Sequence, residues 1–117
     1  MNGENVRVVN SGGFVMKAAL RWTDQNGQTQ ESSGDTGELA LGQYAILGPG
    51  HNGGDNWPQQ GASCWMVAYV RSGPTHESGD NFTWMLGCGA QVVYGISGSV
   101  FNPSWSLDDQ VNGSWET

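Results

Sequence analysis

Two histidines lie close to carboxylates in the sequence, and such pairs can do acid–base chemistry. His51 is followed by Asp55, and His76 is followed by Glu77 and Asp80. A histidine oriented by a carboxylate can activate a serine or cysteine nucleophile. The chain has no G-x-S-x-G element to present such a serine, and polar loops bring these residue types together by chance. We therefore expect no catalytic residues and a non-enzymatic protein. A small hydrolase ranks third, behind the two binding functions given below.

Metal chemistry has one weak candidate, the segment DDQVNGSWE at 108–116. Asp108, Gln110 and Asn112 offer oxygen ligands, loosely as in the first half of a calcium loop. The segment lacks the carboxylate expected at the third position, and it ends before a bidentate glutamate could follow. A polar turn is the simpler interpretation, so no cofactor is expected and calcium is the alternative. The two cysteines have no histidine at the spacing of a zinc site.

Aromatic side chains are the most informative candidates for binding, because the chain has six tryptophans. Trp22 and Trp84 fall on apolar faces and are expected in the core. The others occur among Gly, Asn and Ser or on the reverse face of a strand, where a ring either packs its loop onto the core or contacts a ligand. Such rings suit sugars, quaternary ammonium groups and membrane interfaces. The candidate ligand-binding residues are Trp57, Asn56, Asp55, His51, Trp65, Tyr69, Trp105 and Trp115.

Short alternating segments separated by Gly, Asn, Asp and Pro must position these residues. Strands are expected at 6–9, 14–22, 28–33, 38–47, 63–71, 81–88 and 91–101, with a last short strand near the end of the chain. Period-two alternation places one set of side chains in the core and the other set outside. The sequence thus predicts an all-β fold over 1–117, a single-domain antiparallel β-sandwich or small barrel of about seven to nine short strands.

The segments 63–71 and 81–88 predict a hairpin whose register can be chosen from its apolar pattern. Pairing Cys64 with Cys88 and Met66 with Leu86 makes every pair on that face apolar, and a slip of one residue mixes the faces. This register would allow a Cys64–Cys88 disulfide, which we expect, although two buried free thiols are the alternative.

Composition restricts the partners. The net charge is −7 with only four Lys and Arg, too few to neutralise a nucleic-acid backbone, so no nucleic acid is expected. The acidic balance also favours zwitterionic lipid or neutral glycan over anionic lipid. No run approaches the roughly 18 apolar residues of a membrane span, and the first residues, MNGENVRVVN, show no signal-peptide pattern.

The N-terminal stretch VRVVNSGGFVMKAALRW at 6–22 resembles the opening of aegerolysin-like and other small insecticidal or cytolytic β-sandwich proteins of bacteria. That resemblance implies a toxin or defence protein, secreted or released from a bacterial cell, which binds membrane lipid or surface glycan and acts alone, as a homo-oligomer or with a partner protein. A lectin-like carbohydrate-binding module is the alternative. The long loop GPGHNGGDNWPQQG at 48–61 is the first expected place of ligand contact.

Overall fold

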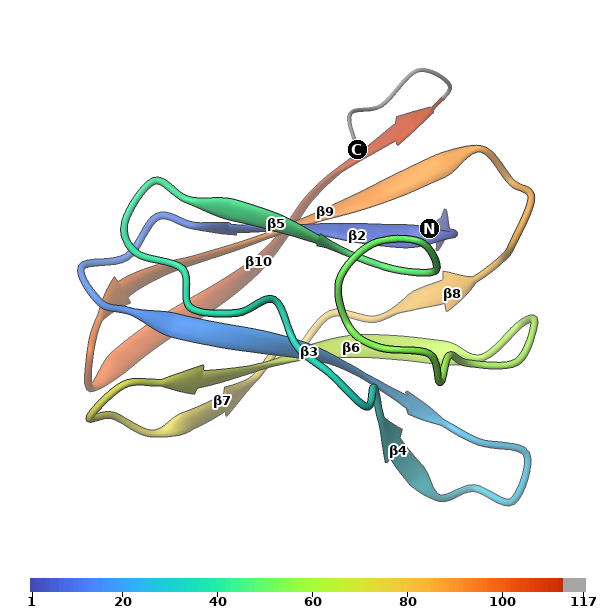
Figure 1. Cartoon of the computed structure of the whole chain (residues 1–117), viewed down its shortest axis with the longest axis horizontal. Helices are drawn as coiled ribbons and strands as arrows, with labels where there is room; N and C mark the ends of the chain where they lie inside the picture. The colour runs from blue at the N-terminus through green and yellow to red at the C-terminus, as the bar shows by residue number, and fades with distance from the viewer. Residues whose placement is uncertain (113–117) are drawn as a thin grey trace.

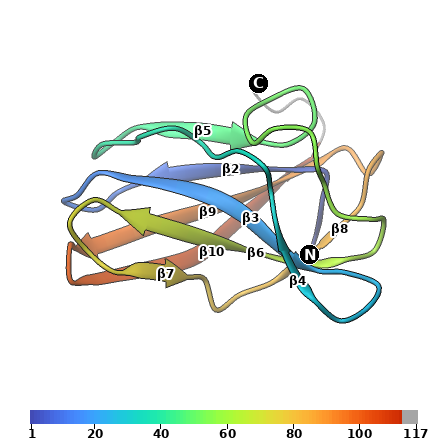
Figure 2. The ribbon, with the colours of Figure 1, turned by 60° about the horizontal axis from the view of Figure 1, so that its bottom comes forward.

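Within residues 1–112, which the computed structural model describes, the chain forms ten β-strands and no helix. Figures 1 and 2 show two layers of strands packed face to face. Accordingly, the described residues contain no helix able to cross a membrane. The strands are β1 (Asn2–Gly3), β2 (Asn5–Asn10), β3 (Met16–Thr23), β4 (Thr29–Glu31), β5 (Tyr44–Leu47), β6 (Ser63–Val70), β7 (Thr75–Glu77), β8 (Phe82–Trp84), β9 (Ala90–Ser99) and β10 (Asn102–Asn112).

The strands form two sheets, and the expected all-β sandwich is confirmed. Sheet A has the order β1-β8-β6-β3-β4, with β7 also paired to β6, and sheet B has the order β10-β9-β2-β5. Two pairings are parallel, β2 with β9 and β1 with β8, so both sheets are mixed. Parallel neighbours need a long connection, and here most of sheet A lies in the chain between β2 and β9. The N-terminal strands β1 and β2 therefore pair with β8 and β9, which come from much later in the sequence.

The core between the sheets follows the alternation of the sequence. Alternate residues from Phe14 to Trp22 are at most 6% exposed, as predicted, whereas Lys17 lies on the outer face. In sheet B, Val92, Tyr94 and Ile96 are fully buried. Burying each of these rows of apolar side chains stabilises the fold by about 25 cal/mol per Å² of apolar surface removed from water. This burial fixes which face of each strand points inward.

The predicted register of the hairpin is wrong, and so is the disulfide. The loop expected at 72–80 contains β7, which takes the pairing with the second half of β6, so that Ala68 lies opposite His76. The chain then returns to the start of β6, where Cys64 pairs with Phe82. Cys88 falls in the turn beyond β8. Cys64 is buried, Cys88 is exposed, and both are free thiols.

The last strand is longer than predicted. β10 runs antiparallel to β9 over almost its whole length, with an irregularity between Leu107 and Asp109. Gly95 of β9 lies beneath that irregularity, since a Cβ there would approach Oδ2 of Asp108 to 2.4 Å. The sequence did not predict the full length of this strand, because the segment carries few apolar side chains and so shows no clear alternation.

Candidate functional site

The loop at 48–61 is held on the core by its tryptophan. Trp57 stacks on buried Trp84 with ring centroids 5.8 Å apart and planes 4° apart. Gly53 has φ of 111°, and a Cβ there would lie 2.5 Å from the Trp57 ring. The glycine therefore lets the loop close over the ring. Trp57, which the sequence left as ligand contact or packing residue, packs against the core and is half-buried.

The polar candidates in the same loop bind the neighbouring segment of the chain. The Asn56 side chain accepts a hydrogen bond from the Ser33 amide and donates one to the Glu31 carbonyl, at 3.0 Å. The Asp55 amide donates to the Ser33 hydroxyl at 3.2 Å, and the His51 amide donates to the Gly48 carbonyl at 2.9 Å. The bonds of Asn56 and Asp55 fasten the loop beside the end of β4, whereas the His51 bond closes a turn within the loop. Ligand contact by the three side chains stays a prediction.

The second histidine group is also part of the framework. The His76 carbonyl accepts a hydrogen bond from Nε1 of Trp105 at 2.9 Å, and the Asp80 carbonyl accepts one from the Tyr94 hydroxyl at 2.6 Å. The Trp105 ring meets Tyr94 edge-on, with centroids 6.0 Å apart. Trp105 therefore closes the side of the sandwich between β10 and β7.

The remaining predictions concern the end of the chain and metal binding. Trp115 lies outside the described residues, as does the second half of the predicted calcium segment. Within residues 1–112, there is no group of three or more His, Cys, Asp or Glu side chains that could hold a metal ion.

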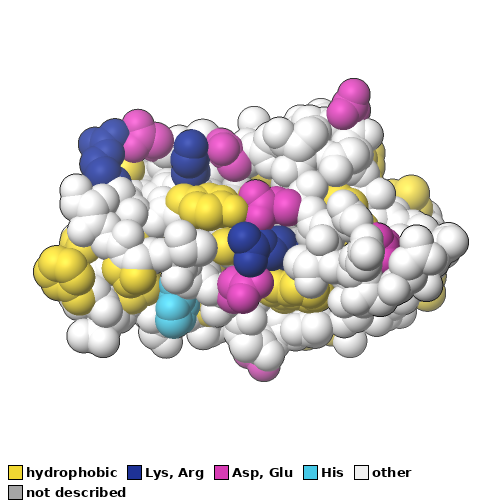
Figure 3. Space-filling view, turned by 90° about the horizontal axis from the view of Figure 1, so that it is seen from below, with side chains coloured by type: hydrophobic (Ala, Val, Ile, Leu, Met, Phe, Trp, Pro, Cys, Tyr) yellow, Lys and Arg dark blue, Asp and Glu magenta, His cyan; other side chains and the backbone are white. Residues whose placement is uncertain are grey.

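Trp65 and Tyr69 lie together on the outer face of sheet A, as the sequence predicted. Figure 3 shows this face, where Lys and Arg side chains alternate with Asp and Glu around hydrophobic ones. Arg21 lies between the two rings and donates to Glu31 at 2.8 Å and to Glu77 at 2.6 Å. The Tyr69 hydroxyl donates to Glu31 at 2.7 Å, and Nε1 of Trp65 donates to Glu77 at 2.9 Å.

These contacts shift the pKa values of the groups in the network. Burial, together with the bond to Glu31, raises the pKa of Tyr69. The hydrogen bonds from Trp65 and Arg21 lower the pKa of Glu77. The network is thus charged and internally satisfied at neutral pH, which suits a rigid polar surface.

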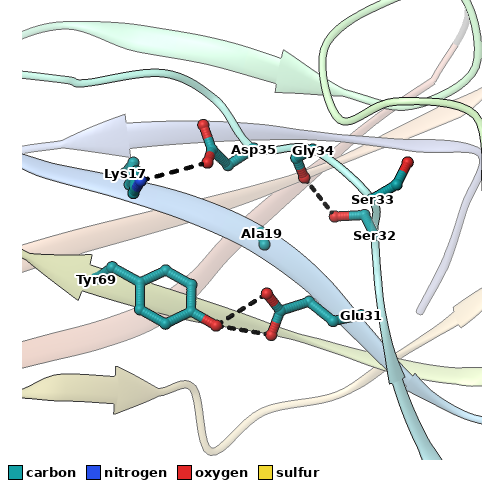
Figure 4. Close-up of a pocket in the computed structure, with 8 residues that line it drawn as sticks. All are labelled: Lys17, Ala19, Glu31, Ser32, Ser33, Gly34, Asp35 and Tyr69. Atoms are coloured by element: carbon teal, nitrogen blue, oxygen red, sulfur yellow. Dashed lines mark hydrogen bonds and ion pairs between the residues drawn. The ribbon is translucent and has the colours of Figure 1, made fainter.

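A hollow of about 270 Å³ lies beside this network (Figure 4). Figure 4 shows the Tyr69 ring and Glu31 on one side of it and Lys17 and Asp35 on the other, with Ala19 of β3 between them. Lys17 Nζ lies 3.8 Å from Asp35. The hollow offers hydroxyl, carboxylate and ammonium groups around an apolar floor, a combination that can hold a small polar molecule such as a sugar ring.

The sequence reasoning missed the strongest apolar feature, which lies at one end of the sandwich. Phe101 is 77% exposed in the turn between β9 and β10, and Leu41 is 65% exposed in the turn before β5. Figure 1 shows both turns at the same end, on the left. We name Leu41 and Phe101 the apolar end. Both residues were predicted to lie within strands, although the turn residues Gly42 and Asn102-Pro103 that follow them signal exposed turns.

One more exposed aromatic residue lies near this end. Tyr44, the first residue of β5, is 49% exposed, and the Arg7 guanidinium carbon lies 5.0 Å from the centre of its ring. Tyr44 pairs with Val9 near the end of β2. The opposite end of the sandwich carries Leu86, which is 50% exposed beyond β8, whereas the predicted register had placed it in the core.

No protein-family model matches the chain, and no curated protein matches its sequence. Solved structures that are similar to it include the membrane-binding domain of pneumolysin, with a TM-score of 0.46, 12% identity, and coverage of 94% of this chain and 97% of that one. Another is a Gram-negative toxin, with a TM-score of 0.48 and 14% identity over 90% of this chain. A third is listeriolysin O, with a TM-score of 0.46 and 14% identity, also over 90% of this chain.

The chain spans 22% of the length of each of the last two structures. The similar structures named here are toxins or a domain of one, and they do not support the expected resemblance to aegerolysins in particular. Similarity of this degree concerns the arrangement of strands and assigns no activity to this chain.

Proposed function

We propose that this chain is a non-enzymatic recognition protein that binds the surface of a lipid membrane through its apolar end, in the manner of a toxin or defence protein. The observation that carries the proposal is the exposure of Phe101, 77%, together with that of Leu41, 65%, on two turns at the same end of the sandwich. Single exposed apolar residues are ordinary on protein surfaces. Two large ones on the turns at one end of a rigid sandwich form a protruding surface that can enter the interfacial region of a bilayer.

The expected affinity follows from the area these side chains can bury. Full burial of a Leu or Phe side chain contributes about 1.5–3 kcal/mol, so the pair supplies about 3–6 kcal/mol. A dissociation constant of 1 mM corresponds to about 4 kcal/mol. The apolar end alone therefore gives weak, reversible membrane binding, and tight binding needs a headgroup contact or several copies of the chain on one membrane. A second copy or a separate partner protein would serve this purpose.

Co-sedimentation with phosphatidylcholine vesicles tests the proposal. The intact chain should sediment with the vesicles, and replacing Phe101 or Leu41 with Ser should each lower the affinity by about 10- to 150-fold, from the lost 1.5–3 kcal/mol. Leu86→Ser is the matched control, since Leu86 is 50% exposed at the opposite end. Equal losses in all three variants, or no binding by the intact chain, would refute the proposal.

The hollow on the outer face of sheet A supports a second candidate, a lectin-like binding module. Its volume of about 270 Å³ is of the size of one sugar ring, and Tyr69 supplies an aromatic wall. Glycan binding that Tyr69→Ala abolishes, while Phe101→Ser leaves it unchanged, would favour this function. A glycan array probed with the two variants and the parent chain distinguishes the candidates.

A further inference from the structure

Arg7 differs from the other cations of the chain because it makes no ion pair with a carboxylate of the described residues. The chain has four Lys and Arg, and three of them, Lys17, Arg21 and Arg71, form ion pairs on sheet A. Arg7 lies on the outer face of sheet B and has no ion pair within residues 1–112. Its Nε is buried and has no hydrogen-bond partner. In a protein of net charge −7, an unpaired, half-buried cation requires an explanation.

The surroundings of Arg7 are apolar on both sides. Its backbone partners in the sheet are Ile46 of β5 and Val93 of β9. Ile46 is only 4% exposed, which indicates that this part of the outer face is covered. Asp109 lies opposite Val93, one strand farther from Arg7, and makes no ion pair with it. The guanidinium therefore lies in surroundings that strengthen the attraction of any anion reaching it.

The ring of Tyr44 holds the guanidinium in place. Stacking on a tyrosine face uses the flat side of the group. Nε is buried, so the donors left for an anion are the two Nη groups at the far edge, which make no hydrogen bond within residues 1–112. Those donors match two oxygens of a phosphate in a bidentate arrangement. Because Tyr44 pairs with Val9, toward the far end of β2, the Arg7 side chain leans toward the apolar end.

We propose that Arg7, stacked on Tyr44, is a binding site for a phosphate group, and that on a membrane it takes the phosphodiester of a zwitterionic phospholipid. The membrane part of this inference rests on the proposed function. Leu41 and Tyr44 are joined by only two residues, so they are at most about 10 Å apart. The interfacial layer of a bilayer is about 5–8 Å thick on each side. When Leu41 reaches the hydrocarbon, the Tyr44 ring and the guanidinium stacked on it can therefore reach the level of the phosphates.

The phosphate site can be tested without a membrane. In ¹⁵N-labelled protein, the Arg7 Nε–H resonance should shift on addition of millimolar inorganic phosphate, and Tyr44→Leu should weaken the shift. Arg71 supplies the internal control, because it is exposed and paired with Glu38, so its resonance should move less. An Arg7 resonance that moves no more than that of Arg71 would overturn the site.

Vesicles then distinguish a lipid phosphate from a free one. Arg7→Gln should lower the affinity for phosphatidylcholine vesicles by about tenfold. Arg7→Lys should lower this affinity by a smaller factor, and Arg71→Gln should leave it unchanged. Vesicle binding that depends on Phe101 and not on Arg7 would overturn the lipid part and leave the proposed function standing. A phosphate-dependent Arg7 shift without vesicle binding would support a site for soluble phosphates, while the proposed function fails. Circular dichroism spectra identical to that of the parent chain establish that the variants are folded.

Discussion

Replacing Trp57 with Ala should destabilise the fold by about 3 kcal/mol and leave membrane binding unchanged. A tryptophan buries about 150–250 Å², and half of that area at 25 cal/mol per Å² contributes about 2–3 kcal/mol. The offset stack on Trp84, with centroids 5.8 Å apart, adds about 0.5–1.5 kcal/mol. Since Trp84 is fully buried, removing its stacking partner also opens a space next to the core.

Guanidinium chloride unfolding followed by far-UV circular dichroism measures this loss, because it does not depend on the fluorescence of the removed residue. Trp57→Phe is the matched variant and should recover more than half of the loss, since a ring still covers Trp84. A loss below about 1 kcal/mol would show that Trp57 does not hold the loop. Unchanged stability with lost vesicle or glycan binding would assign Trp57 to ligand contact and refute the reasoning.

Three further predictions concern thiols and pH. In the folded protein Ellman's reagent should modify Cys88 alone, because burial raises the pKa of Cys64 to about 12; a native Cys88→Ser variant that still reacts at once would contradict this. Burial also raises the pKa of Tyr94 above its ordinary 10.0, so its stabilisation is full below pH 10 and is lost as the pH rises beyond it. Tyr94→Phe should flatten the alkaline part of a stability profile, and an unchanged slope would disprove the assignment. The lowered pKa of Glu77 stabilises the fold above its ordinary 4.5 and ceases to do so at lower pH. Glu77→Gln should therefore reduce the acid sensitivity, by less than about 1 kcal/mol because the pair with Arg21 is partly exposed.

The sequence predicted the inner faces of the strands well, because burial leaves a period-two pattern that needs no knowledge of partners. The alternate residues from Phe14 to Trp22 show this. Pairing between distant strands leaves no such pattern, so the parallel contact of β2 with β9 was not foreseen. The hairpin register failed for a related reason: an all-apolar pairing of Cys64 with Cys88 looked best, but β7 is polar and competes for the same partner strand.

Composition was a weaker guide to the candidate site than to the fold. The sequence left the tryptophans of polar segments open between packing and ligand contact, and in the structure Trp57 packs on Trp84 and Trp105 donates its N–H to a backbone carbonyl. Such rings end buried when a neighbouring partner exists, and the sequence does not identify that partner. Phe101, a single ring beside turn residues, turned out to be the more exposed aromatic residue.

The arginines on the two outer faces of the sandwich differ in whether carboxylates pair with them, and this difference links stability to function. On sheet A, Arg21 is satisfied by Glu31 and Glu77, so this face is a closed network in which a ligand must compete with existing bonds. On sheet B, Arg7 has a buried Nε without an acceptor, which costs about 1–3 kcal/mol. The stacking contact with Tyr44 returns only about 0.5–1 kcal/mol. An oxyanion at the Nη edge would offset part of this net cost through its attraction to the half-buried guanidinium, which the Tyr44 ring already orients. The same accounting implies that an isosteric apolar residue at position 7 would stabilise the fold while removing the phosphate site.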